Sequence, residues 1–105
     1  MPKTKTKGGS ALKEITRIEL DEPKMYHVVL HNDDITTMEF VVMILTTVFH
    51  KSEIEANTLM LQVHKKGNAI VGTYSFDMAN TLQIKASQLA RKAGYPLNIT
   101  IEPAK

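Results

Sequence analysis

Residues 26–31 alternate in the way that predicts a half-buried β-strand. Tyr26, Val28 and Leu30 share one face of this strand, and the residues between them share the other. A single strand with one apolar face is not stable in water, because that face must be covered. The rest of the chain must therefore supply further strands beside it and helices over it.

Helix caps and apolar residues at helical spacing predict three helices. Thr36 stands three residues before Glu39, which makes a capping box. Ser52 and Glu55 make a second one, and Ser75 is placed to cap the third helix. The residues expected to face the core are Val41, Ile44, Leu45, Val48 and Phe49 in the first helix, Ala56, Leu59, Met60 and Val63 in the second, and Ala79, Leu82, Ala86, Leu89, Ala90 and Ala93 in the third.

Two further strands are predicted at 68–74 and 97–102, each rich in apolar residues. Gly67 and Gly94 are expected to end the second and third helices. The element order is then β-α-α-β-α-β. We predict an α+β fold in which three helices pack on one face of a small three-stranded antiparallel sheet.

The first 23 residues differ from the rest in composition. Residues 1–23 include a Lys/Thr alternation, a Gly-Gly-Ser run and a late acidic stretch, with few clustered apolar residues. They predict a flexible N-terminal extension, although apolar positions 12, 15 and 18 could form a transient helical stripe. Residues 24–105 are expected to form one domain, because 105 residues are too few for two independent cores.

Composition excludes several classes of function. The chain has no Cys, which removes disulfides, thiolate metal sites and a thiol nucleophile. The net charge is +2, and Lys3, Lys5 and Lys7 in the extension account for more than this excess. The rest of the chain is close to neutral, so no basic face for nucleic acid is expected. No apolar run approaches the roughly 20 residues of a membrane span, and we expect a cytoplasmic protein without a membrane partner.

Metal and catalytic motifs are not recognisable. His27 and His31 share a strand face but lie about 13 Å apart along it, too far to bind one ion. We therefore expect no metal and no cofactor. A Gly-rich phosphate loop and a strained serine elbow are also missing from the sequence. One enzymatic alternative stays open, in which Asp33 and His64 meet as the acid and base of a hydrolase.

The same residues are better suited to binding. Asn32 and Asp33 lie where the first strand passes into the first helix, a common place for functional side chains. Together with a neutral His64, they offer hydrogen-bond acceptors that suit the three donors of an ammonium group. The alternative is that Asn32, Asp33 and Asp34 are only a turn and His64 only a helix-end residue.

Three segments closely resemble ClpS, the N-degron adaptor family of the Clp AAA+ proteases. They are MYHVVLHNDD with the following Thr36 and MEFV at 25–41, LMLQVHKKG at 59–67, and Tyr95-Pro96-Leu97. The likeness covers about residues 24–105. It implies an adaptor and not an enzyme, one that binds proteins whose first residue is Leu, Phe, Tyr or Trp. It also implies delivery, as a monomer, to a ClpA- or ClpC-type unfoldase with its ClpP protease.

The resemblance also implies roles for individual residues. Asn32, Asp33 and His64 would hold the free α-amino group of the substrate. The pocket for its first side chain would be lined by Thr36, Met38, Val41, Met60, Val63 and Leu97. A ribosomal stalk-like interaction module is a competing expectation, and it has no need of the Asn32/Asp33/His64 group.

Three departures from the family pattern concern the pocket rim and the docking patch. Thr37 stands where the family usually has Pro, which would only preorganise the first helical turn. Ile35 replaces a commonly aromatic residue at the rim. Leu82 replaces a Lys in the patch implicated in docking to the unfoldase, although Asp77 nearby stays acidic. Which unfoldase is the partner therefore stays open.

Overall fold

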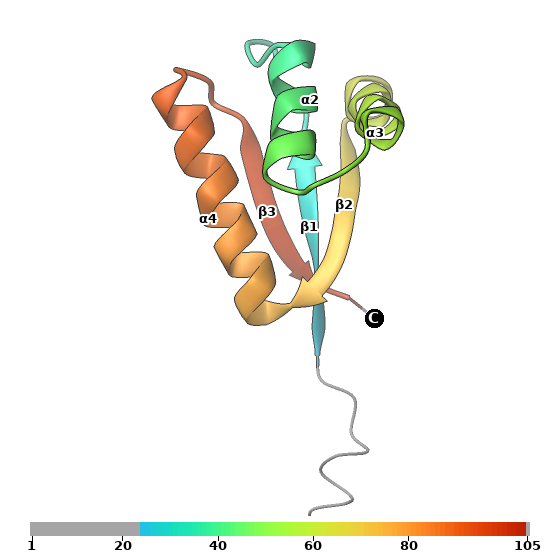
Figure 1. The fold of residues 1–105 in the computed structure, drawn as a ribbon, viewed down its shortest axis with the longest axis vertical. Helices are drawn as coiled ribbons and strands as arrows, with labels where there is room; N and C mark the ends of the chain where they lie inside the picture. Colours follow the sequence, from blue (N-terminus) through green and yellow to red (C-terminus); the bar gives the residue numbers. More distant parts are fainter. Residues whose placement is uncertain (1–23, 105) are drawn as a thin grey trace, which may run out of the picture.

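β1 (Met25–His31) is the central strand of the fold. A computed structural model describes residues 24–104, and the predicted flexible extension, residues 1–23, lies outside them. β2 (Asn68–Ser75) and β3 (Asn98–Pro103) lie on either side of β1 and pair with it antiparallel. The predicted three-stranded antiparallel sheet is thereby confirmed (Figure 1).

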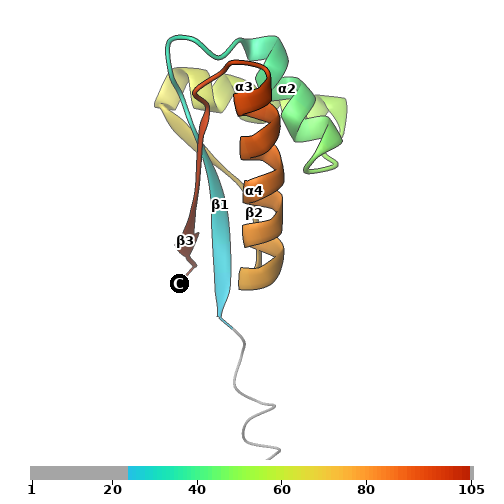
Figure 2. The same cartoon turned by 90° about the vertical axis from the view of Figure 1, so that its left-hand side faces the viewer.

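Three helices complete the described domain: α2 (Met38–Thr47), α3 (Glu53–Lys66) and α4 (Phe76–Lys92). The element order is the predicted β-α-α-β-α-β. α4 runs along the sheet, whereas α2 and α3 lie near the end of β1 (Figures 1 and 2). No helix within residues 24–104 is long and apolar enough to cross a membrane.

One hydrophobic core joins the sheet to all three helices. Val28 and Leu30 of β1 are fully buried in it, as are Ile44 of α2 and Ala56 of α3. α4 contributes mainly alanines, and short side chains let a helix approach a sheet closely. The other core residues are Val41, Leu45, Val48, Phe49, Val63, Ala69, Val71, Ala79, Ala86, Ala90, Leu97 and Ile99.

Local signals fix the helix ends largely as predicted. The Ser52 hydroxyl accepts a hydrogen bond from the backbone N–H of Glu55 at 3.1 Å, and the Glu55 carboxylate accepts one from the Ser52 N–H at 3.4 Å. This reciprocal pair is the predicted capping box of α3. Ser75 caps α4, and Gly67 ends α3 with φ +94°, a backbone conformation that glycine adopts without strain.

The N-cap of α2 differs from the prediction by one residue. Thr37, and not Thr36, accepts the capping hydrogen bond, which the backbone N–H of Phe40 donates at 3.1 Å. The hydroxyl of Thr36 instead donates to the carboxylate of Asp33 at 2.7 Å. Thr36 therefore belongs to the loop before the helix.

Two positions predicted for the inner face of α4 lie outside the core. Leu89 is 36% exposed, and Ala93 is exposed just after the last helical residue. Ala86 and Ala90 are four residues apart and fully buried, so they define the row that faces the sheet. Leu89 lies to one side of this row, and that explains its exposure.

Candidate functional site

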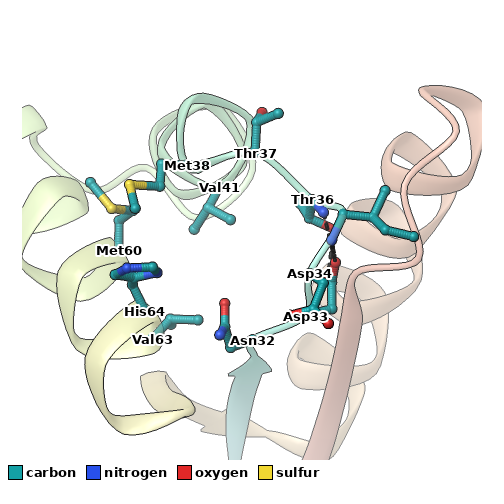
Figure 3. A pocket seen from close by; sticks show the side chains of 11 residues that line it. Asn32, Asp33, Asp34, Thr36, Thr37, Met38, Val41, Met60, Val63 and His64 are labelled. Atoms are coloured by element: carbon teal, nitrogen blue, oxygen red, sulfur yellow. Dashed lines mark hydrogen bonds between the residues drawn. The ribbon is translucent and has the colours of Figure 1, made fainter.

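A cavity of about 390 Å³ opens between α2, α3 and the loop that follows β1. Such a volume lies within the usual range for small-ligand sites. Figure 3 shows side chains from both helices and from the loop pointing toward its centre. The residues that line it are Asn32, Asp33, Asp34, Ile35, Thr36, Thr37, Met38, Val41, Met60, Val63 and His64.

The walls of the cavity are apolar. Val41 of α2 and Val63 of α3 point into it from opposite sides, and they are only 6% and 2% exposed (Figure 3). Met38 and Met60 add their flexible thioether side chains, one from each helix. Met38 is 41% exposed and so stands at the mouth of the cavity. This arrangement suits an apolar side chain that enters from solvent.

Two polar side chains reach into the cavity. The amide of Asn32 points to the centre, and the imidazole of His64 projects toward it from α3 (Figure 3). The backbone N–H of Asn32 donates to the carbonyl of Gly67 at 2.9 Å, which fixes the end of β1 against the end of α3. Both side chains are exposed, so a ligand can reach their acceptor atoms.

The carboxylate of Asp33 is turned toward its own loop. One oxygen accepts hydrogen bonds from the backbone N–H groups of Ile35 and Thr36, at 2.8 and 2.6 Å. The other oxygen accepts from the Thr36 hydroxyl. Partial burial raises the pKa of Asp33, but these hydrogen bonds and the charge of Arg91 outweigh that effect, and the pKa is lowered overall. Asp33 thus shapes the mouth of the cavity through the loop.

Asp34 is a lining residue that the sequence reasoning did not name. It is exposed and carries a second carboxylate at the cavity. The signal was present in the sequence, because Asp34 belongs to the same Asn-Asp-Asp run as Asn32 and Asp33. Ile35 and Thr37, noted only as departures from the family pattern, also line the cavity.

Leu97 is the one predicted wall residue that the structure places elsewhere. It is 1% exposed and belongs to the hydrophobic core, just before β3, and it is not among the residues that line the cavity. Its carbonyl accepts a hydrogen bond from the guanidinium of Arg91 at 2.9 Å.

Arg91 connects the last loop of the domain to the site. Its guanidinium donates to the carbonyls of Tyr95 and Leu97, and its charge acts on Asp33. The ring of Tyr95 packs against Phe40 of α2, with centroids 4.7 Å apart. The loop between α4 and β3 thus packs against α2 and is fixed by the same arginine whose charge acts on Asp33.

Asp33→Asn is expected to lower the free energy of unfolding by about 1 kcal/mol at neutral pH, because it weakens charged hydrogen bonds at a half-exposed position. The folded pKa lies below the ordinary 3.8, so this contribution is present above that value and is lost as the pH falls below it. Urea denaturation at a series of pH values measures the difference from wild type, which should disappear in acid.

Asp34→Asn is the matched control for this prediction. It removes the neighbouring carboxylate but none of the hydrogen bonds that hold the loop. Its free energy of unfolding should stay close to that of the wild type. An equal loss of stability in both variants would show that the hydrogen bonds of Asp33 do not stabilise the loop.

The cavity does not present the features of a hydrolytic or metal site. Asp33 and His64 lie on opposite sides of it, and the Asp33 carboxylate is directed to Thr36 (Figure 3). Among residues 24–104, no group of three or more His, Cys, Asp or Glu side chains is placed to hold a metal ion. An apolar pocket with polar groups at one end is suited to binding.

Comparisons with known proteins agree on one family. Residues 21–100 match the family model described as ATP-dependent Clp protease adaptor protein ClpS. A ClpS adapter protein of Acetivibrio thermocellus is 45% identical over 92 residues, which cover 88% of this chain and 93% of that protein. One of Desulforapulum autotrophicum is 54% identical over 80 residues, covering 76% of this chain and 77% of that protein.

A solved structure shows the same fold with a ligand. The structure of Agrobacterium tumefaciens ClpS2 bound to L-phenylalaninamide superimposes with a TM-score of 0.77 at 41% identity. The match covers 79% of this chain and all of the Agrobacterium chain. The chain described here therefore belongs to the ClpS family of ATP-dependent Clp protease adaptor proteins.

Proposed function

We propose that this ClpS-family protein captures polypeptides whose first residue is Leu, Phe, Tyr or Trp and delivers them to a Clp unfoldase for degradation. The observation that carries the proposal is the cavity between α2 and α3, with apolar walls and two polar side chains that point into it. L-phenylalaninamide, the ligand of the Agrobacterium relative, has an aromatic side chain, a free α-amino group and an amide. A Phe at the start of a polypeptide has the same three parts.

The apolar walls would hold the side chain of the first residue. Val41 and Val63 would form opposite walls of the pocket, with Met38 and Met60 closing around the ligand and Thr36 at the rim. Full burial of a Leu or Phe side chain contributes roughly 1.5–3 kcal/mol. A small or polar first residue forgoes most of this free energy. The pocket thereby distinguishes bulky hydrophobic residues from the others.

The polar groups would hold the α-amino group. The carbonyl of the Asn32 amide and an unprotonated ring nitrogen of His64 are the acceptors that reach into the cavity. The exposed Asp34 supplies a negative charge nearby, and Asp33 supports the loop and adds its own charge. A cationic amine among these groups gains charge-assisted hydrogen bonds that a neutral amide cannot make.

Capture and delivery would depend on different parts of the chain. The protein would act by binding, as a cytoplasmic monomer, and the ClpP protease coupled to a ClpA- or ClpC-type unfoldase would cut the substrate. Residues that line the cavity lie between positions 32 and 64. Contact with the unfoldase requires other surfaces, because the pocket is occupied by substrate during transfer.

Calorimetric titration with peptides that differ only in the first residue tests the proposed capture. Peptides beginning with Leu or Phe should bind at least about 10-fold more tightly than the peptide beginning with Ser, since 1.4 kcal/mol of lost burial corresponds to a factor of ten. Asn57→Ala on α3 is a suitable control variant because Asn57 does not line the cavity. If the Ser-starting peptide bound as tightly as the Leu- and Phe-starting peptides, the pocket would not be what selects the first residue.

Deletion of residues 1–21 is expected to separate delivery from capture. Peptide affinity should stay near that of the full chain, because no lining residue belongs to this segment. Degradation of a Leu-starting substrate by the complete Clp unfoldase and protease should slow, since the ClpS resemblance implies that this extension is presented to the unfoldase. If the Clp unfoldase and protease degraded the substrate at full rate with the shortened protein, the extension would be a mere linker.

A further inference from the structure

We propose that Met38 and Met60 form an oxidation site, at which conversion of either thioether to a sulfoxide closes the pocket to hydrophobic first residues. The inference rests on the proposed function of the same pocket. It adds a form of control, in which peroxide-class oxidants lower substrate capture and reduction of the sulfoxide restores it.

Both sulfur atoms belong to the wall of the cavity. Met38 begins α2 and is 41% exposed, and Met60 on α3 is half-buried. Figure 3 shows the two side chains together on one side of the cavity, with their sulfur atoms above the imidazole of His64. The chain contains no Cys, so no thiol of its own competes for the oxidant.

Three other methionines are exposed to a similar degree as Met38 but lie outside the cavity. Met25, Met43 and Met78 are 39%, 37% and 51% exposed, and none of them lines the cavity. An oxidant in solution reaches these three about as easily as it reaches Met38. Exposure therefore does not distinguish the proposed site. The proposed site differs from the other methionines because Met38 and Met60 line the cavity, so their oxidation changes the binding surface.

The chemical step is a two-electron oxygen transfer. A lone pair of the thioether sulfur attacks one oxygen of hydrogen peroxide, an S–O bond forms and the O–O bond breaks. The hydroxide that leaves takes up the proton of the oxygen now bound to sulfur and departs as water, which leaves the neutral sulfoxide. The sulfur is oxidised and the peroxide is reduced. A methionine sulfoxide reductase reverses the change, with a dithiol that is oxidised to a disulfide as the oxygen leaves as water.

A sulfoxide oxygen in this wall is costly for ligand binding. Sulfoxidation converts a flexible apolar group into a polar one, and the apolar wall residues Val41 and Val63 offer no side-chain donor. Of the side-chain donors at the cavity, the Thr36 hydroxyl already donates to Asp33 and Thr37 points away from the centre (Figure 3), which leaves those of Asn32 and His64. If either side chain rotates to donate a hydrogen bond to the sulfoxide oxygen, it no longer binds the α-amino group of the substrate. Both outcomes weaken binding of an apolar first residue.

The test compares three full-length proteins before and after treatment with hydrogen peroxide. They are the wild type, the variant Met38→Leu with Met60→Leu, and the control variant Met25→Leu, Met43→Leu and Met78→Leu. Leu fills a similar apolar volume and cannot form a sulfoxide. Peptide mass spectrometry gives the sulfoxide fraction at each methionine, and titration with a Leu-starting peptide gives the affinity of each sample relative to its own untreated state.

Oxidised wild type and the oxidised control variant are expected to lose about 10-fold in affinity, and the Met38/Met60 variant to keep its own untreated value. Bound Leu peptide should slow sulfoxide formation at Met38 and not at Met78, and treatment with methionine sulfoxide reductase should restore the wild type. An equal loss in the Met38/Met60 variant overturns the inference. So does unchanged affinity of wild type oxidised at Met38 and Met60, or absence of sulfoxide there when Met78 is oxidised.

The two proposals fail in different measurements. If untreated wild type does not select the Leu peptide over the Ser peptide, the proposed function fails. If untreated wild type selects the Leu peptide and oxidation leaves that affinity unchanged, only the oxidation site fails.

Discussion

A Leu- or Phe-starting peptide with an acetylated N-terminus is expected to bind at least about 100-fold more weakly than the same peptide with a free α-amino group. Acetylation removes the positive charge and two of the three N–H donors. The acceptors of Asn32 and His64 then face a neutral amide, and the carboxylates of Asp33 and Asp34 lose their cationic partner. Calorimetric titration of both peptides measures the ratio directly.

Variants of the polar groups show whether the effect arises at the proposed place. Asn32→Ala and His64→Ala should each lower the affinity for the peptide with a free N-terminus and leave the affinity for the acetylated peptide nearly unchanged. The ratio of the two affinities should therefore become smaller. Asn57→Ala should leave the ratio as in wild type. If the acetylated peptide binds wild type as tightly as the free peptide does, recognition of the α-amino group is ruled out.

Element order could be predicted from the sequence because local interactions determine it. The capping box of Ser52 and Glu55, the cap at Ser75 and the glycine at position 67 all act within a few residues of the backbone they fix. The alternation in β1 similarly predicts that Val28 and Leu30 face the core, although Val29 on the other face is also buried, at 4% exposed. Such signals do not depend on the rest of the fold, and so they hold in the structure.

The first helix shows where local signals become ambiguous. Thr36 and Thr37 are adjacent, and either hydroxyl could cap a helix. The choice is settled by Asp33, whose carboxylate takes the hydroxyl of Thr36 and leaves Thr37 to accept from Phe40. A capping motif alone does not predict which threonine caps the helix, because the choice depends on the conformation of the preceding loop.

The cavity could be only partly predicted, because its wall and the core use the same residue types. Val63 and Leu97 are both apolar and nearly inaccessible to solvent, yet only Val63 lines the cavity. Periodicity indicates that a residue is buried and not what it is buried against. Asp33 and Asp34 pose the same problem, since only the geometry of the loop shows which carboxylate is engaged with the backbone.

Met38→Ala is expected to admit peptides that begin with Ile or Val. Met38 lies at the mouth of the cavity, where the Cβ of the first residue would pass, and β-branched residues carry an extra substituent on that carbon. Because Met is flexible, the wild type should disfavour them by about 1–3 kcal/mol relative to Leu, the usual cost of overpacking. The shorter Ala removes this obstruction and also loses contact with Leu.

The measurement is a titration of Leu, Ile and Val peptides against wild type, Met38→Ala and Met43→Ala. Met43 lies on the same helix with similar exposure, 37%, but outside the cavity, so its variant should retain the wild-type preference. In Met38→Ala, affinity for Ile and Val should rise while that for Leu falls, which is the mark of selection by exclusion. Equal binding of Ile and Leu peptides to wild type would mean that Met38 lines the pocket without acting as a gate.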